Sequence, residues 1–138
     1  GEMRYLLTAS PAFVARHFPR GLTPAALAKA PAVAFDQRDD MHVSFMARHF
    51  ALAPGGYPCH TVRSSEAFVA MAEQGLACCL IPELQIRQQL AQGLLLDLSP
   101  DLHLVERLYW HRWVLERGLH KQISQRLIEQ GRRALQPR

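Results

Sequence analysis

The sequence has few cysteines, and their arrangement argues against a disulfide-stabilised domain and against a metal site built from cysteines. Only three occur among 138 residues: Cys59, Cys78 and Cys79. An odd number with two adjacent members is a poor disulfide framework. Neighbours on a strand point to opposite faces, so Cys78 and Cys79 do not easily bind one metal ion together. We therefore expect buried thiols in a reducing, cytoplasmic setting.

Long hydrophobic runs and familiar catalytic motifs are also missing. No apolar run approaches the ~20 residues of a membrane-spanning helix, so we expect no membrane partner. We expect no signal peptide, because GEMR leads directly into strand-like sequence. The chain has no G-x-S-x-G elbow, P-loop or dinucleotide-binding glycine motif. His42 and His49 can share one helix face, but no third metal ligand is evident. These absences argue against an enzyme, a cofactor and a bound metal ion.

The bulk composition fits one globular domain or part of one. Apolar residues make up 49% of the chain and charged residues 20%, which is ordinary for a soluble domain. The chain begins with GEMR and enters strand-like sequence at once, so we expect it to be a piece of a longer protein. The formal net charge of +4 divides into −1 for residues 1–102 and +5 for residues 103–138. We interpret the basic segment as a solvated helix surface rather than a nucleic-acid site, because it lacks interleaved aromatic and glycine residues.

Apolar periodicity and turn residues predict an α/β protein in which strands and helices alternate. Ser10-Pro11 and Thr23-Pro24 are typical helix starts, and Gly75 is typical of the position after a helix end. The expected strands are 4–9, 32–35, 60–63, 76–81, 94–98 and 108–114. The expected helices are 11–17, 24–29, 41–50, one from Ser64 or Ser65 to Gly75, 84–92 and 119–135.

The most regular stretch is TVRSSEAFVAMAEQGLACCLIPE, residues 61–83. An apolar run leads into Ser64-Ser65, an amphipathic helix follows, and Gly75 precedes a second apolar run that ends at Pro82. A run that is apolar on both faces is typical of a central parallel strand. The stretch therefore predicts a strand–helix–strand unit with parallel strands.

Three corners between a strand and a helix carry residues suited to binding: Ser10-Pro11, Asp36 to Asp40, and Ser64-Ser65. In open α/β sheets, ligands bind at the carboxyl ends of strands. A helix N-terminus with serine hydroxyls suits a carboxylate or phosphate, and an aspartate suits an ammonium or guanidinium. Converging corners would suit a small zwitterion such as an amino acid. The alternative is that each serine only caps its helix.

The order of these features resembles a known family. The stretches MRYLLTASPAFVARHFPRGLTPAALAKAPAVAFDQRDDMH and SSEAFVAMAEQGLACCLIPE resemble the effector-binding domain of LysR-type transcriptional regulators. Within them, AFDQRDDMH, SSEAFV and CCLIP, together with LYWHR further on, are similar to the branch of the family that responds to arginine and lysine. The resemblance covers essentially the whole chain.

This resemblance implies a two-lobed fold like that of the type 2 periplasmic binding proteins, with the effector in the cleft between the lobes. Residues 1–100 would form the second lobe, a parallel-rich mixed sheet flanked by helices. Residues 101–138 would supply the returning strand and final helix of the first lobe, whose other parts are missing from the chain. The helix-turn-helix domain would also lie outside the chain.

The resemblance further implies a site and a function. The second-lobe residues facing the cleft would be Ser10, Phe35, Asp36, Arg63, Ser64 and Ser65. The effector would be lysine or arginine, and its binding would change how a homo-oligomer, a dimer or tetramer, engages promoter DNA through the absent helix-turn-helix domain. Apolar surface left by the missing lobe favours a dimer or a swapped arrangement of this chain. The alternative is a stand-alone solute-binding or enzymatic α/β domain.

Overall fold

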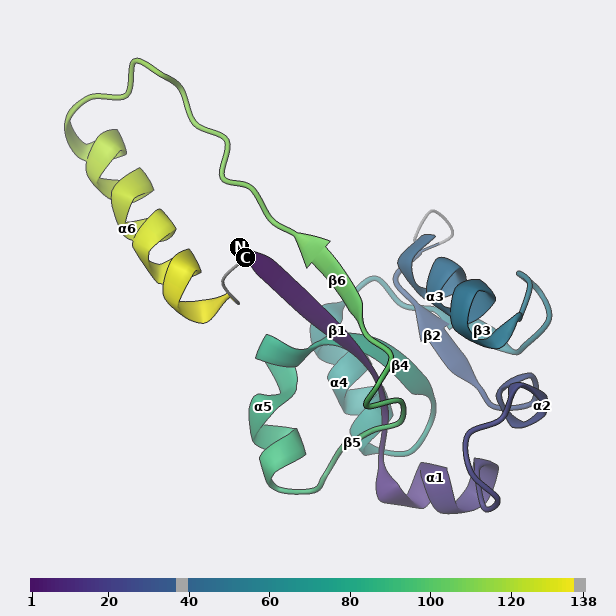
Figure 1. The fold of residues 1–138 in the computed structure, drawn as a ribbon. Coiled ribbons are helices and arrows are strands. Elements are labelled where there is room, and N and C mark those ends of the chain that lie inside the picture. Colours follow the sequence, from purple (N-terminus) through teal and green to yellow (C-terminus); the bar gives the residue numbers. More distant parts are fainter. Residues whose placement is uncertain (37–39, 136–138) are drawn as a thin grey trace.

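The computed structural model describes residues 1–36 and 40–135; residues 37–39, in the middle of the predicted corner from Asp36 to Asp40, lie outside it. Strands and helices alternate along most of the described chain (Figure 1). The strands are β1 (Glu2–Ala9), β2 (Ala32–Ala34), β3 (Cys59–Thr61), β4 (Cys78–Pro82), β5 (Leu96–Asp97) and β6 (Leu104–Arg107). The helices are α1 (Pro11–His17), α2 (Pro24–Leu27), α3 (Asp40–Phe50), α4 (Ser65–Glu73), α5 (Glu83–Ala91) and α6 (Gly118–Ala134).

The strands form one mixed sheet in the order β3-β2-β4-β1-β5, with β6 also paired to β1. β2 runs parallel to both β3 and β4. β1 runs antiparallel to β4, β5 and β6. The predicted strand–helix–strand unit is therefore confirmed as β3–α4–β4, and its two strands lie on either side of β2.

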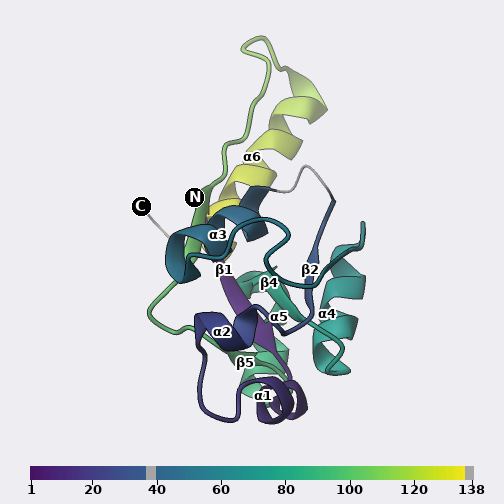
Figure 2. The same ribbon diagram turned by 90° about the vertical axis from the view of Figure 1, so that its right-hand side faces the viewer.

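Helices cover both faces of the central strands, and each face has its own core. Figure 2 shows α3 and α4 on opposite sides of β2. Along β4 the buried side chains alternate: Cys78 and Leu80 join the core beneath α1, α2 and α3, whereas Cys79 and Ile81 join the core beneath α4 and α5. Burial on both faces explains why this strand is continuously apolar. Burial also raises the pKa of the Cys78 thiol to about 12, so it stays protonated at neutral pH.

Local sequence signals account for the helix boundaries. The Ser10 and Thr23 hydroxyls accept hydrogen bonds from the backbone N–H groups of Phe13 and Ala26, at 3.3 and 3.2 Å. Each is followed by a proline in the first helical turn, where a missing N–H costs nothing. Gly75 follows α4 with φ +68°, a left-handed conformation that favours glycine. These three predicted boundaries are confirmed.

The predicted strand at 108–114 is wrong. The strand in this region is β6, and residues 108–114 form no strand in the described structure. β6 pairs with β1 in the register Glu2↔Arg107, and Leu108 completes the ladder against the backbone of Gly1. The position of the strand therefore follows from pairing with β1, and the apolar pattern of residues 108–114 alone does not make a strand.

The C-terminal region projects from the rest of the molecule. Figure 1 shows residues 108–117 leaving the sheet and α6 returning beside them. Trp110 Nε1 donates to the Ser124 hydroxyl at 3.4 Å, which ties the segment to the helix. Trp113, Val114 and Leu115 are 85%, 98% and 81% exposed. Within residues 1–36 and 40–135, no helix has the length and apolar character needed to cross a membrane.

Candidate functional site

The candidate site lies at one edge of the sheet, where three helices begin. β2, β3 and β4 are parallel, with Ala32 in register with both Cys59 and Cys78, so their carboxyl ends meet at the same edge. From that edge the chain continues into α3, α4 and α5, respectively. The N-terminal amide groups and the positive ends of three helix dipoles therefore lie at the same end of the parallel strands, the usual ligand-binding position in open α/β folds.

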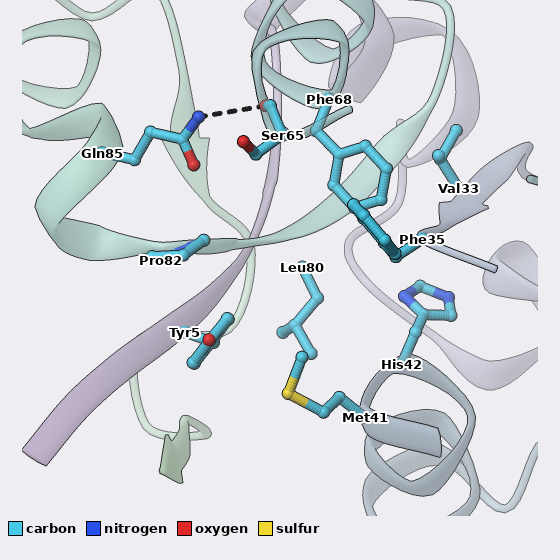
Figure 3. A pocket seen from close by; sticks show the side chains of 10 residues that line it. All are labelled: Tyr5, Val33, Phe35, Met41, His42, Ser65, Phe68, Leu80, Pro82 and Gln85. Atoms are coloured by element: carbon cyan, nitrogen blue, oxygen red, sulfur yellow. Dashed lines mark hydrogen bonds between the residues drawn. The ribbon is translucent and has the colours of Figure 1, made fainter. Parts of the chain in front are cut away.

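A pocket of about 160 Å³ opens between these helix starts. Apolar side chains form most of its surface, and hydroxyl, imidazole and amide groups are placed around them (Figure 3). The lining residues are Tyr5, Val33, Phe35, Met41, His42, Ser65, Phe68, Leu80, Pro82 and Gln85. Cavities of about 150 Å³ hold a small organic molecule, so the pocket is large enough for part of an amino acid.

The two adjacent serines have different environments. Ser64 is the N-cap of α4: its hydroxyl accepts from the Ala67 N–H at 3.2 Å and donates to the Glu66 carboxylate at 3.0 Å. The pKa of Glu66 is lowered, first by a hydrogen bond with its own backbone and then by the Ser64 hydroxyl. Ser65 lines the pocket, and its hydroxyl also donates to the Glu66 carboxylate, at the longer distance of 3.5 Å. The Ser64 hydroxyl therefore caps α4, whereas Ser65 is the serine that lines the pocket.

Phe35, Asp36 and Arg63 lie at the carboxyl ends of β2 and β3. Phe35 lines the pocket, and its ring packs edge-on against Phe68 with centroids 6.3 Å apart. The carboxylate of the adjacent Asp36 forms an ion pair with Arg63 at 3.8 Å. The Arg63 side chain is 75% exposed, and exposed pairs of this kind contribute little to stability. This pair can therefore be exchanged for contacts with a charged ligand at small cost.

Ser10 does not lie with the other predicted site residues. β1 is antiparallel to β4, with Tyr5 opposite Pro82 and Thr8 opposite Cys79, so its carboxyl end lies at the far edge of the sheet. Ser10 is 4% exposed there, and its hydroxyl caps α1. The expected convergence of three corners is therefore wrong for the Ser10 corner. The direction of β1 is the cause, because a strand-to-helix corner faces the site only when its strand runs parallel to the others.

Several pocket residues were not anticipated from the sequence. Tyr5 reaches the pocket because the antiparallel β1 brings its amino end to this edge. His42 is 1% exposed, and its ring centroid lies 5.7 Å from that of Tyr57. Gln85 donates from Nε2 to the backbone oxygen of Ser65 at 3.0 Å. The strand-then-helix rule, applied to Pro82 and the helix after it, could have identified Gln85; no comparable signal marks Tyr5 or His42.

The polar groups of the site do not form a metal centre. In the part of the chain that the structure describes, no three His, Cys, Asp or Glu side chains lie close enough to bind a metal ion. The pocket offers a hydroxyl and a helix N-terminus for an anion, and an apolar floor. The Asp36 carboxylate follows the pocket residue Phe35 in the chain and pairs with Arg63.

Known proteins with the same architecture place the chain in a family. Residues 1–124 match the LysR substrate binding domain family. The HTH-type transcriptional regulator ArgP of Aeromonas salmonicida is 91% identical over 137 residues, which are 99% of this chain and 46% of that protein. ArgP of Sodalis glossinidius (strain morsitans) is 51% identical over 135 residues, or 98% and 46% of the two chains. The predicted likeness to this branch is confirmed.

Solved structures agree with the fold. ArgP from Mycobacterium tuberculosis superposes with a TM-score of 0.80 at 37% identity, covering 97% of this chain and 44% of that one. LysG from Corynebacterium glutamicum with bound effector Arg superposes with a TM-score of 0.86 at 24% identity, covering 99% and 46%. The predicted mixed α/β fold of the periplasmic-binding-protein type is confirmed, and the chain spans about half the length of the relatives it matches. By sequence and by fold, this chain belongs to the family of LysR substrate-binding domains.

Proposed function

We propose that the chain is the effector-sensing part of an HTH-type regulator and that its effector is a basic amino acid, arginine or lysine. One observation carries the proposal: Ser65, at the N-terminus of α4, and Phe35, at the end of β2, line the same apolar pocket, and Asp36 follows Phe35 in the chain. LysG, which shares the fold, has arginine bound as its effector. The named relatives are transcriptional regulators, which supports a non-enzymatic role and a cytoplasmic location, and gives no support to a stand-alone transport or enzymatic domain.

The effector's carboxylate would bind at the start of α4. The Ser65 hydroxyl lines the pocket there, and the helix dipole favours a negative charge at that end. The Glu66 carboxylate accepts from the Ser64 hydroxyl at 3.0 Å and from the Ser65 hydroxyl at 3.5 Å. The effector's carboxylate would replace Glu66 as the acceptor of the Ser65 hydroxyl, whose present bond is the longer of the two, and would also contact the Ser65 amide.

The effector's side chain would extend over the apolar floor toward Asp36. Phe35, Phe68 and Leu80 line this part of the pocket, and their surfaces suit the methylene groups of lysine or arginine. The terminal cation would then pair with Asp36 in place of, or beside, the exposed Arg63 guanidinium. A neutral side chain of the same length would lack this last contact.

The pocket would be one wall of a larger cleft. Its volume of about 160 Å³ is below the roughly 300–1,000 Å³ of sites that enclose drug-sized ligands. We assign residues 1–100 to the second lobe and residues 101–138 to the strand and helix that return to the first lobe. Closure of the two lobes around the effector would alter the arrangement of a dimer or tetramer on promoter DNA, which a helix-turn-helix domain outside this chain would bind.

The test is a calorimetric titration of the full-length protein with arginine, lysine and norleucine, which has a neutral side chain of similar length. We expect both basic amino acids to bind and norleucine to bind at least about tenfold more weakly, because it cannot pair with Asp36. Absence of heat and of any thermal shift at millimolar arginine and lysine would overturn the proposal.

A further inference from the structure

We propose that Gln85 accepts a hydrogen bond from the α-ammonium group of the effector, and that this contact distinguishes an amino acid from a simple carboxylic acid. The inference rests on the proposed function, because it takes the effector's carboxylate to lie at the N-terminus of α4. Gln85 is one of the residues lining the pocket.

The structure fixes the orientation of the Gln85 amide. The residue lies in the first turn of α5, and its Nε2 donates to the Ser65 backbone oxygen at 3.0 Å. A backbone carbonyl only accepts hydrogen bonds, so the NH₂ end of the amide must face α4. The Oε1 end is therefore turned away from α4, and Figure 3 shows it on the side where Pro82 lies.

The position of Oε1 matches the geometry of an amino acid. Nε2 and Oε1 are bonded to the same carbon, so Oε1 also lies close to Ser65. In an amino acid, the ammonium and carboxylate groups are likewise attached to one carbon. An effector whose carboxylate contacts Ser65 thus carries its ammonium group within reach of Oε1.

An acceptor is needed at this end of the pocket because the adjacent surface is apolar. Pro82 lines it beside Gln85 (Figure 3), and the proline side chain cannot accept a hydrogen bond. Placing an ammonium group against such a surface without an acceptor is unfavourable. Gln85 provides the acceptor, and its bond to Ser65 keeps the amide from turning its donor end toward the cation.

The test compares arginine with 5-guanidinopentanoate, which is arginine without its α-amino group, as ligands of the full-length protein. The variants are Gln85→Met and the matched control Gln88→Met on the exposed side of the same helix. We expect the wild type and the control to prefer arginine by about tenfold or more, as for a hydrogen bond to a charged group. Gln85→Met should lose most of this preference, chiefly through weaker binding of arginine.

Gln85→Glu is the second variant, because it keeps an acceptor but cannot donate to Ser65. We expect it to retain the preference for arginine, and loss of the preference would contradict the inference. Equal weakening of both ligands by Gln85→Met would also overturn it, because Gln85 would then only join α4 to α5. A wild type that binds neither ligand would instead refute the proposed function itself, and this inference with it.

Discussion

Ser64 and Ser65 are adjacent in the chain, yet the two residues have different surroundings in the fold. The Ser64 hydroxyl satisfies the Ala67 N–H within α4, whereas Ser65 lines the pocket. A helix cap contributes to stability whether or not a ligand is present. Stability and binding should therefore respond to different single substitutions.

Ser64→Ala should lower the free energy of unfolding by about 1 kcal/mol, the usual effect of losing a helix cap. Ser65→Ala should change it by less than about 0.5 kcal/mol but weaken arginine binding several-fold. Urea unfolding and calorimetric titration of both variants provide the comparison. The assignment fails if Ser65→Ala destabilises the protein as much as Ser64→Ala does, or if Ser65→Ala leaves the affinity for arginine unchanged.

Residue patterns could predict which residues lie together at the candidate site only where the strand direction was inferred correctly. Phe35, Asp36, Ser64 and Ser65 follow strands that are parallel, and the structure brings them to one edge. Ser10 follows the antiparallel β1 and lies at the other. A strand's direction within the sheet depends on pairing with residues far away in the chain, so it cannot be predicted from the local sequence.

At the level of secondary-structure elements, the residue that follows the C-terminus of α4 packs closely against the start of α1. Gly75 has φ +68°, and a Cβ atom there would lie 3.1 Å from the Ser10 Oγ. Ser10 is itself buried and holds the first turn of α1, so it has little freedom to move away. Although Ser10 does not belong to the site, it packs against the end of the helix that begins there.

Gly75→Ala should therefore destabilise the protein by about 2 kcal/mol, the sum of left-handed backbone strain and the tight contact. Gly93→Ala is a matched control: its φ is +69°, but nothing lies within 4 Å of the added Cβ. We expect about 1 kcal/mol for the control, from backbone strain alone. Denaturant unfolding of both variants measures these changes. If the free energy of unfolding falls equally in both, the contact with Ser10 does not contribute to stability.

Helices and strands were predicted correctly where local sequence signals set their boundaries. The prediction failed where pairing between distant strands determines which residues form a strand. The predicted boundaries of α1 agree with the structure because Ser10 and Pro11 specify its start directly. β6 was missed and a strand was expected at 108–114 instead, since LYWHRWV is rich in residues that favour strands. The strand forms at Leu104–Arg107, where the backbone pairs with residues 2–5 of β1.

At the level of the whole molecule, the C-terminal region presents an extensive apolar surface. Leu119, Ile123 and Leu127 are 67%, 47% and 46% exposed along α6, next to the exposed apolar residues of the preceding segment. Contiguous apolar patches of this kind usually mark interaction surfaces. In the proposed two-lobed protein, the remainder of the first lobe would cover this face.

The chain of residues 1–138 on its own should accordingly associate as its concentration rises. Replacing Leu119 and Leu127 by glutamate should reduce this association without loss of folding, because both side chains are exposed. Leu76→Glu, at a 55% exposed leucine outside this region, should leave association unchanged. Sedimentation velocity over a concentration series is the measurement, and a monodisperse monomer at the highest concentration would contradict the expectation.

The most direct test of the account is a crystal structure of the full-length protein grown with arginine. We expect the effector's carboxylate within hydrogen-bonding distance of Ser65, its methylene groups over Phe35 and Phe68, and its guanidinium beside Asp36. Arginine bound elsewhere, with this pocket filled by protein side chains or solvent, would contradict the claim that the carboxyl edge of β2, β3 and β4 is the effector site.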